Sequence, residues 1–169
     1  MDWFLSQCRK GSVLVPHPFQ RSRRIEVSLS PRDVTCLVFW TKFPSRMLAS
    51  LDAVEDLGIP FYIQCTLNPY DRDLEPAMEP LERRIDAYKA LAQRVGTHRV
   101  IRRYDPIIVN EVYPLDFHID AWMHLADALE GYSTSCVISF VDRYRSTPGY
   151  VREIMTDEME TLAREFSKT

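Results

Sequence analysis

The sequence lacks the cysteine patterns that hold metals in small proteins. Its four cysteines are scattered as Cys8, Cys36, Cys65 and Cys136, with no CxxC pair and no histidine at a ligand-like spacing from any of them. We therefore expect no metal site in this chain. Cys65 and Cys136 lie in apolar runs, so we expect small strand side chains there and no disulfide.

Histidine motifs are missing as well. The four histidines form no HExxH pattern, and His118 and His124 are too far apart in a helix to share one face. We expect these side chains to be solvated.

The chain also has no long hydrophobic run and no surplus of one charge. No stretch approaches the about 18 apolar residues of a membrane span, and the start MDWFLSQCRKG has an acid where a leader has basic residues. The 21 basic residues against 24 acidic ones, including the short RSRR run at 21–24, argue against a nucleic-acid or membrane partner. We expect a cytoplasmic protein.

What the sequence does contain is enough for one globular domain. It has 169 residues, of which 46% are hydrophobic and 27% charged. From residue 36 onward, short apolar runs alternate with amphipathic segments, which is typical of βα units that build a parallel sheet. The predicted strands are 36–42, 60–67, 99–105 and 134–141, and a predicted helix follows each of them. The clearest helix has apolar residues at Leu81, Ile85, Tyr88, Ala92 and Val95.

The first 35 residues differ from the rest. A short helix is predicted to end at Gly11, and 12–16 and 24–30 are predicted to pair as a β-hairpin around a polar loop. We therefore predict a single incomplete (βα) barrel domain over 1–169, with a helix plus hairpin in 1–35 and four βα units in 36–169.

The alternation of side chains in the second predicted strand favours a barrel. Phe61, Ile63 and Cys65 occupy one face, whereas Tyr62 and Gln64 occupy the other. A sheet covered by helices on both sides would need two apolar faces, whereas a barrel lumen accepts a polar one. The predicted fold class is therefore α/β, a partial (βα) barrel of parallel strands, and a doubly wound sheet is the alternative.

Polar residues gather at the carboxyl ends of the predicted strands, where ligands bind in parallel βα folds. The charged candidates for catalysis are Lys42, Arg103 and Asp105, with Arg103 as an anion clamp and Asp105 as a proton acceptor. The candidates for ligand binding are Trp40, Gln64, Thr66, Asn68, Ser139 and Asp142. No metal ligand is proposed.

Each candidate also has a purely structural interpretation. Arg103 and Asp105 are about 6.6 Å apart along one strand face, so they could neutralise each other. Lys42 could extend into solvent at the barrel mouth. The amide and hydroxyl groups could form an internal hydrogen-bond layer. The sequence leaves these alternatives open.

Several longer motifs resemble those of a known family. They are VLVPHPF, VSLSPRDVTCLVFWTKFP, GIPFYIQCTLNPY, ERRI, RVIRRYDPII and CVISFVDRY, in this order. Together they resemble the uncharacterised family called domain of unknown function 1848. The resemblance implies a barrel-like protein about twice as long, with a carboxyl-terminal cysteine group like that of radical S-adenosylmethionine enzymes. Neither that cysteine group nor the Ser-Arg-Arg-Thr-Asp type motif expected near the start of such proteins is present here.

Three functional hypotheses follow. The first is that the chain is the amino-terminal half of a radical-SAM-like barrel enzyme of unknown substrate, with the iron–sulfur cluster and S-adenosylmethionine found only in longer relatives. The second is a metal-free binding module for a small anionic metabolite. The third is a non-functional remnant. Because an incomplete barrel leaves strand edges open, we also expect self-association through those edges.

Overall fold

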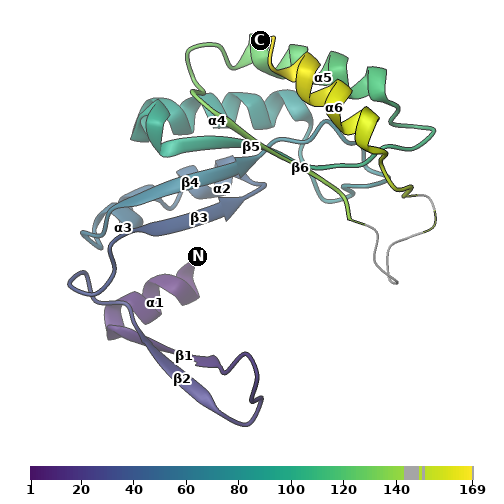
Figure 1. Cartoon of the computed structure of the whole chain (residues 1–169). Helices are drawn as coiled ribbons and strands as arrows, with labels where there is room; N and C mark the ends of the chain where they lie inside the picture. The colour runs from purple at the N-terminus through teal and green to yellow at the C-terminus, as the bar shows by residue number, and fades with distance from the viewer. Residues whose placement is uncertain (143–148, 150, 169) are drawn as a thin grey trace.

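Four parallel strands form the centre of the computed structural model, which describes residues 1–142, 149 and 151–168 (Figure 1). They are β3 (Leu37–Thr41), β4 (Phe61–Thr66), β5 (Val100–Ile107) and β6 (Cys136–Phe140), and they pair in the order β3-β4-β5-β6. The four predicted strands are thus confirmed. The ends differ at β5, which continues past Pro106 with a shift in its pairing to β6 between Tyr104 and Ile107. The Asp105–Pro106 peptide bond within this shift is cis.

The helices that follow these strands pack on one face of the sheet (Figure 1). They are α2 (Pro44–Leu48), α3 (Leu51–Glu55), α4 (Leu81–Val95), α5 (Leu115–Ala128) and α6 (Thr156–Phe166), and the short helix η1 (Thr97–Arg99) precedes β5. Their apolar stripes share one core with the alternate strand residues that point the same way, among them Ile63, Cys65 and Tyr104. Burial of this stripe and of the matching strand face holds each βα unit together.

The strand order explains why the sheet has a helix-covered face and a helix-free face. Each strand pairs with the next one in the chain, and the crossovers all run over the same side. A doubly wound sheet would instead reverse its order and carry helices on both sides. The arrangement is that of a barrel that does not close, so the predicted partial (βα) barrel is confirmed. Among the described strands, β3 and β6 each pair with one neighbour only.

The amino-terminal segment forms the predicted helix and hairpin. Helix α1 (Asp2–Lys10) ends at Gly11, whose φ of 84° is the left-handed conformation that favours glycine. The antiparallel strands β1 (Ser12–Pro16) and β2 (Arg24–Ser28) follow. The ring of Phe4 lies edge-on against Phe39 with centroids 5.7 Å apart, which joins α1 to the β3 end of the sheet. The division of the chain at residue 35 stays a prediction.

One histidine contradicts the expectation that all of them are solvated. His118 on α5 has no exposed surface, and its ring lies between Tyr104 and the backbone of Ile108. Its Nε2 is 3.0 Å from the Ile108 carbonyl and must donate to it, so Nδ1 accepts from the Tyr104 hydroxyl at 2.8 Å. Burial lowers the pKa of His118, in keeping with this neutral tautomer.

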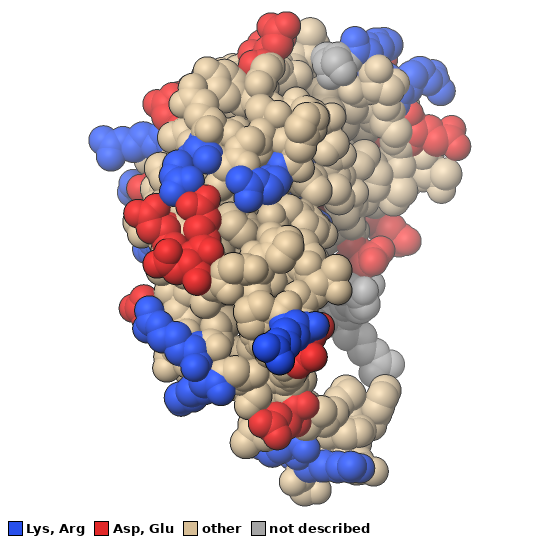
Figure 2. Space-filling view, turned by 90° about the vertical axis from the view of Figure 1, so that its left-hand side faces the viewer, with Lys and Arg blue, Asp and Glu red and all other residues tan. Residues whose placement is uncertain are grey.

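Within the described residues, no helix combines the length and the apolar character needed to cross a membrane. Figure 2 shows basic and acidic side chains interspersed on the face it presents, with wide areas of neither kind. No broad single-sign patch forms on that face of a chain whose net charge is −3. A phosphate backbone would need such a patch.

Candidate functional site

A row of polar side chains crosses the helix-free face of the sheet. Trp40 on β3 lies opposite Gln64 on β4, and Arg103 and Asp105 on β5 lie between Gln64 and Ser139 on β6. The sequence named all five as candidates near the carboxyl ends of the strands, and the structure brings them together. We call these five residues the polar row.

Hydrogen bonds connect the polar row. Arg103 donates from Nε to Asp105 Oδ2 at 2.9 Å and from Nη1 to Gln64 Oε1 at 2.5 Å, and its Nη2 also contacts Asp105. Ser139 donates its hydroxyl to the other carboxylate oxygen of Asp105. The guanidinium lies 5.3 Å from the centre of the Trp40 ring. Of the two interpretations left open by the sequence, the structure therefore has Arg103 and Asp105 paired with each other.

Asp105 is ionised in this setting. Burial alone would raise its pKa, but the hydrogen bonds from Ser139 and Arg103, together with the charges of Arg103 and Lys42, outweigh burial and lower the pKa. The Asp105 side chain is 22% exposed to solvent and the Arg103 side chain is 18% exposed. A solvent-borne molecule could therefore reach both groups, with Asp105 as a hydrogen-bond acceptor.

Trp40 is the most accessible member of the polar row. Its side chain is 73% exposed, and Val38 two residues earlier on the same face is 46% exposed. An indole so exposed contributes little to the core, whereas an aromatic face beside hydrogen-bonding groups suits recognition of a small molecule. The polar row thus combines a flat apolar surface with acceptors and donors fixed by one another.

Asn68 was predicted to bind a ligand, but the structure gives it a supporting position. It is 1% exposed, its Nδ2 donates to the Asp105 carbonyl at 2.9 Å, and its Oδ1 accepts from the Asp105 amide at 2.9 Å. This pair of bonds fixes the backbone of β5 at the residue that carries the carboxylate. Asn68 is therefore a positioning residue, since its polar atoms are used within the protein.

Lys42 belongs to a second charged group at the rim. Its Nζ lies 2.6 Å from Glu75 Oε1, and Glu75 Oε2 lies 3.5 Å from Arg84 Nη1. Arg84 is 2% exposed and also donates to the Asn68 carbonyl at 2.9 Å. The Lys42 side chain is 41% exposed, in keeping with the structural interpretation that it extends into solvent. Its ammonium group nevertheless pairs with Glu75, an acid that the sequence analysis did not name.

Glu75 and Arg84 were thus missed. Arg84 falls on the buried stripe of α4, one residue before Ile85 and four before Tyr88, so helical periodicity was a signal for its burial. Glu75 lies in the irregular segment between β4 and α4, where no periodicity applies. Its tertiary contacts with Lys42 and Arg84 identify it.

The remaining two candidates do not join the polar row. Thr66 points to the same side as Gln64 but is only 8% exposed, so it is not open to a ligand. Asp142 is exposed and lies beyond the end of β6. Its predicted role in binding stays a prediction.

The cysteines do not fit the iron–sulfur group that the resemblance implies for longer relatives. Cys8 lies on α1, Cys36 precedes β3, Cys65 is buried on β4 and Cys136 begins β6. Burial raises the pKa of Cys65 to about 12, so it stays a neutral thiol. Over residues 1–142, 149 and 151–168, no three side chains of the metal-binding types lie close enough to hold an ion. We derive no chemistry through such a cluster.

Comparison with models of protein families gives a match to "Domain of unknown function (DUF1848)" over residues 1–169, the whole chain. No curated protein and no solved structure matches.

Proposed function

The chain belongs to the family Domain of unknown function (DUF1848), and from this premise we propose that its helix-free sheet face is a wall of a binding site for a small polar metabolite. The observation that carries the proposal is the polar row beside the exposed Trp40, on the face that the crossover helices leave open. In parallel βα folds, ligands bind at the carboxyl ends of the strands. Asp105 and Ser139 lie in the carboxyl-terminal halves of their strands, and Arg103 lies near the middle of β5.

A purely structural role accounts for the polar row less well. An ion pair in a partly buried place rarely stabilises a fold more than apolar residues of the same size. Packing alone also gives no reason for a Trp that is 73% exposed next to that pair. Both features are accounted for if the face receives a molecule that stacks on the indole and bonds to the polar groups.

The hydrogen bonds favour a particular ligand chemistry. Arg103 already faces Asp105 and Gln64, so its charge is largely countered. Asp105 is an ionised acceptor that a ligand hydroxyl or amide can approach. We therefore favour a small molecule that carries hydroxyl or amide groups beside an apolar ring face, as a sugar or a nucleoside does.

A second candidate is a small anion, as expected for the metal-free module. The observation in its favour is Lys42, whose ammonium group remains 41% exposed at the rim despite its contact with Glu75. A carboxylate or phosphate would bind there with its charge toward Lys42 and its body toward Trp40.

Thermal stability of the chain tests both candidates. With glucose, adenosine, acetate and inorganic phosphate as probes, we expect a saturable rise in the melting temperature for one of the first two. Trp40→Ala should abolish that rise, whereas Trp3→Ala, which removes an indole 66% exposed on α1, should not. A rise with acetate or phosphate alone would favour the second candidate. No saturable rise with any probe, or an equal rise in Trp40→Ala, would refute the proposed site.

The radical-SAM-like enzyme remains a hypothesis about the longer relatives that the resemblance implies. Because the cysteines here lie on separate elements, the chain itself is expected to bind no cluster. The hypothesis is tested on a longer relative, purified without oxygen, by its iron and sulfide content and by cleavage of S-adenosylmethionine.

A further inference from the structure

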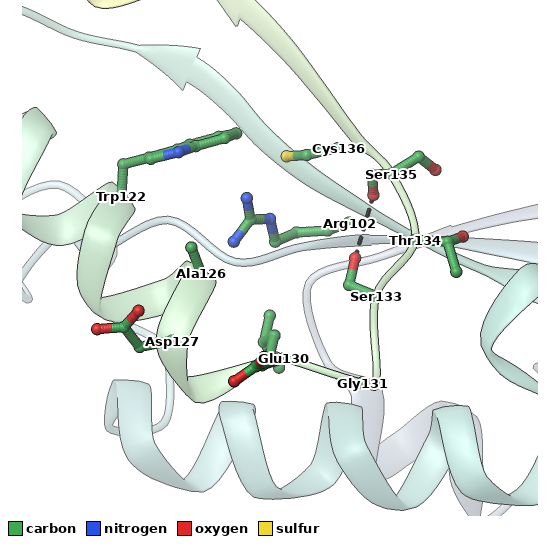
Figure 3. Close-up of a pocket in the computed structure, with 11 residues that line it drawn as sticks. Arg102, Trp122, Ala126, Asp127, Glu130, Gly131, Ser133, Thr134, Ser135 and Cys136 are labelled. Atoms are coloured by element: carbon green, nitrogen blue, oxygen red, sulfur yellow. Dashed lines mark hydrogen bonds between the residues drawn. The ribbon is translucent and has the colours of Figure 1, made fainter. Parts of the chain in front are cut away.

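A cavity of about 480 Å³ lies on the helix-covered side of the sheet, near the amino-terminal ends of β5 and β6 (Figure 3). It shares strands β5 and β6 with the polar row but lies on the opposite face of the sheet, so that Arg102 and its sequence neighbour Arg103 point to different sides. Its walls come from α5, from the loop after α5 and from the first residues of the two strands. The volume is in the range of small-molecule pockets.

Arg102 is the cationic group of this cavity. It is 5% exposed, and strand pairing puts it between Cys65 on β4 and Cys136 on β6. Residues of α5 cover Arg102 and keep it from solvent. Figure 3 shows the guanidinium directed into the space between Trp122 and Ala126.

No counter-ion accompanies this guanidinium. Its Nε is buried and forms no hydrogen bond, and none of the carboxylates in residues 1–142, 149 and 151–168 lies within 4.0 Å of it. The guanidinium carbon lies 4.2 Å from the centre of the Trp122 ring, and this aromatic face partly stabilises the positive charge. A cation–π contact offsets only part of the cost of burying a charge without a partner.

The nearby thiol does not replace a counter-ion. Burial raises the pKa of Cys136 despite the opposing influence of Arg102, so the sulfur stays protonated. Asp127 and Glu130 also line the cavity, but both are exposed and Figure 3 shows their carboxylates turned away from Arg102. The cavity therefore has a cation inside and two acids near its opening.

These features define the chemistry of the occupant. A planar carboxylate matches the fork of an arginine, whereas a phosphate dianion would be repelled by Asp127 and Glu130 on entry. Trp122, Ala126 and Leu129 provide apolar wall for an organic body. Ser133 and Ser135 provide polar groups beside the charge, with the Ser133 hydroxyl donating to the Ser135 carbonyl at 3.1 Å.

We infer that this cavity is a second ligand site, which binds a small monocarboxylate with an apolar body through Arg102. The inference does not depend on the polar row, because the two sites share no residue.

Benzoate binding to the full chain tests the inference. We expect saturable binding by calorimetry, with a change in the side-chain Nε–H signal of Arg102 in nuclear magnetic resonance spectra; benzyl alcohol, which has the same ring without the charge, should not bind. Arg102→Leu should weaken benzoate binding about tenfold or more, since a charged hydrogen-bond partner is lost. Arg94→Gln is the matched control, because Arg94 is a surface residue paired with Asp52 and Glu55, and it should bind benzoate as the natural chain does.

A second variant keeps the test valid if Arg102→Leu fails to fold. Ala126→Leu fills the cavity from α5 without touching the charge and should also weaken benzoate binding. Equal affinity of the natural chain and Arg102→Leu, or no saturable binding of benzoate, would overturn the inference. Tighter binding of inorganic phosphate than of benzoate at Arg102 would overturn the carboxylate assignment.

Discussion

At the scale of single residues, strand alternation predicts the face to which a side chain points better than it predicts how deeply that side chain is buried. Alternation along the stretch RRYD puts Arg103 and Asp105 on the face opposite Arg102, as the structure has them, because successive strand side chains must point to opposite sides. It did not reveal that Arg102 is buried, because depth depends on whether α5 lies over that position. Strand alternation also did not reveal that Arg103 bonds to both Asp105 and Gln64. These bonds depend on the side-chain rotamers and on the register of the neighbouring strand.

The lowered pKa of Asp105 makes a prediction about acid stability. A carboxyl whose folded pKa is depressed contributes stability above its unfolded pKa near 4 and loses that contribution as the pH falls toward the folded value. Asp105→Asn should therefore destabilise the chain by about 1–2 kcal/mol at pH 7, discounted for partial exposure. The difference between the variant and the natural chain should shrink below about pH 4.

Urea unfolding at pH 7 and at several lower pH values measures this difference. Asp142→Asn, which alters an exposed carboxylate beyond the end of β6, is the control and should have little effect. A constant difference between Asp105→Asn and the natural chain at all pH values would contradict an ionised Asp105.

At the scale of elements, Asn68 joins the end of β4 to the end of β5. Its two hydrogen bonds to the Asp105 backbone continue the link between β4 and β5 beyond their last paired residues, Thr66 and Arg103. The Leu67 amide donates to the Arg103 carbonyl beside them at 3.0 Å. The orientation of the Asp105 carboxylate thus depends on a residue that cannot itself meet a ligand.

Asn68→Ala is expected to destabilise the chain by about 1–3 kcal/mol, because it leaves an amide and a carbonyl of Asp105 without their partners in a partly buried place. Urea unfolding measures the loss. Thr66→Val, a nearby buried change that removes a hydroxyl and keeps the side-chain volume, should cost less. If both variants lose the same amount, the side-chain amide of Asn68 is not the link between the strands.

The elements themselves were largely predictable from the sequence. Apolar runs predicted the four strands of the sheet to within a few residues, and a helical segment follows each strand as predicted. The predicted helix after β3 is divided into α2 and α3, and η1 was not predicted. Gly11 marked the end of α1. The candidate site was predictable where it lies on regular strands. It was not predictable at Glu75, because residues between β4 and α4 are placed by tertiary contacts with Lys42 and Arg84 rather than by any repeat.

At the scale of the whole molecule, the sheet is open on one face and at both edges. β3 and β6 pair on one side only in the described part of the chain, and the helix-free face exposes Val38, Trp40 and Val137. Open strand edges beside exposed apolar side chains favour association with another strand. A second copy is a suitable partner, because two four-stranded sheets supply the eight strands of a common closed barrel.

We therefore expect the chain to dimerise or associate further as its concentration rises. Light scattering during size-exclusion chromatography measures the mass. Val38→Lys adds a charge on β3, where the side chain is already 46% exposed, and should shift the equilibrium toward the monomer. The control Met123→Lys adds the same charge on α5 and should not. A monomer at all concentrations would contradict this expectation.

The order of the strands also bears on how the chain reaches this structure. Paired positions such as Leu37 and Phe61, Gln64 and Ile101, or Arg103 and Val137 are 24, 37 and 34 residues apart, so the parallel pairings in the described part of the chain join segments of moderate sequence separation. Contacts of moderate sequence separation have a modest entropy cost of loop closure and therefore favour rapid folding. During synthesis each strand would emerge beside a neighbour that is already available, so the sheet can grow on the ribosome in the direction of translation.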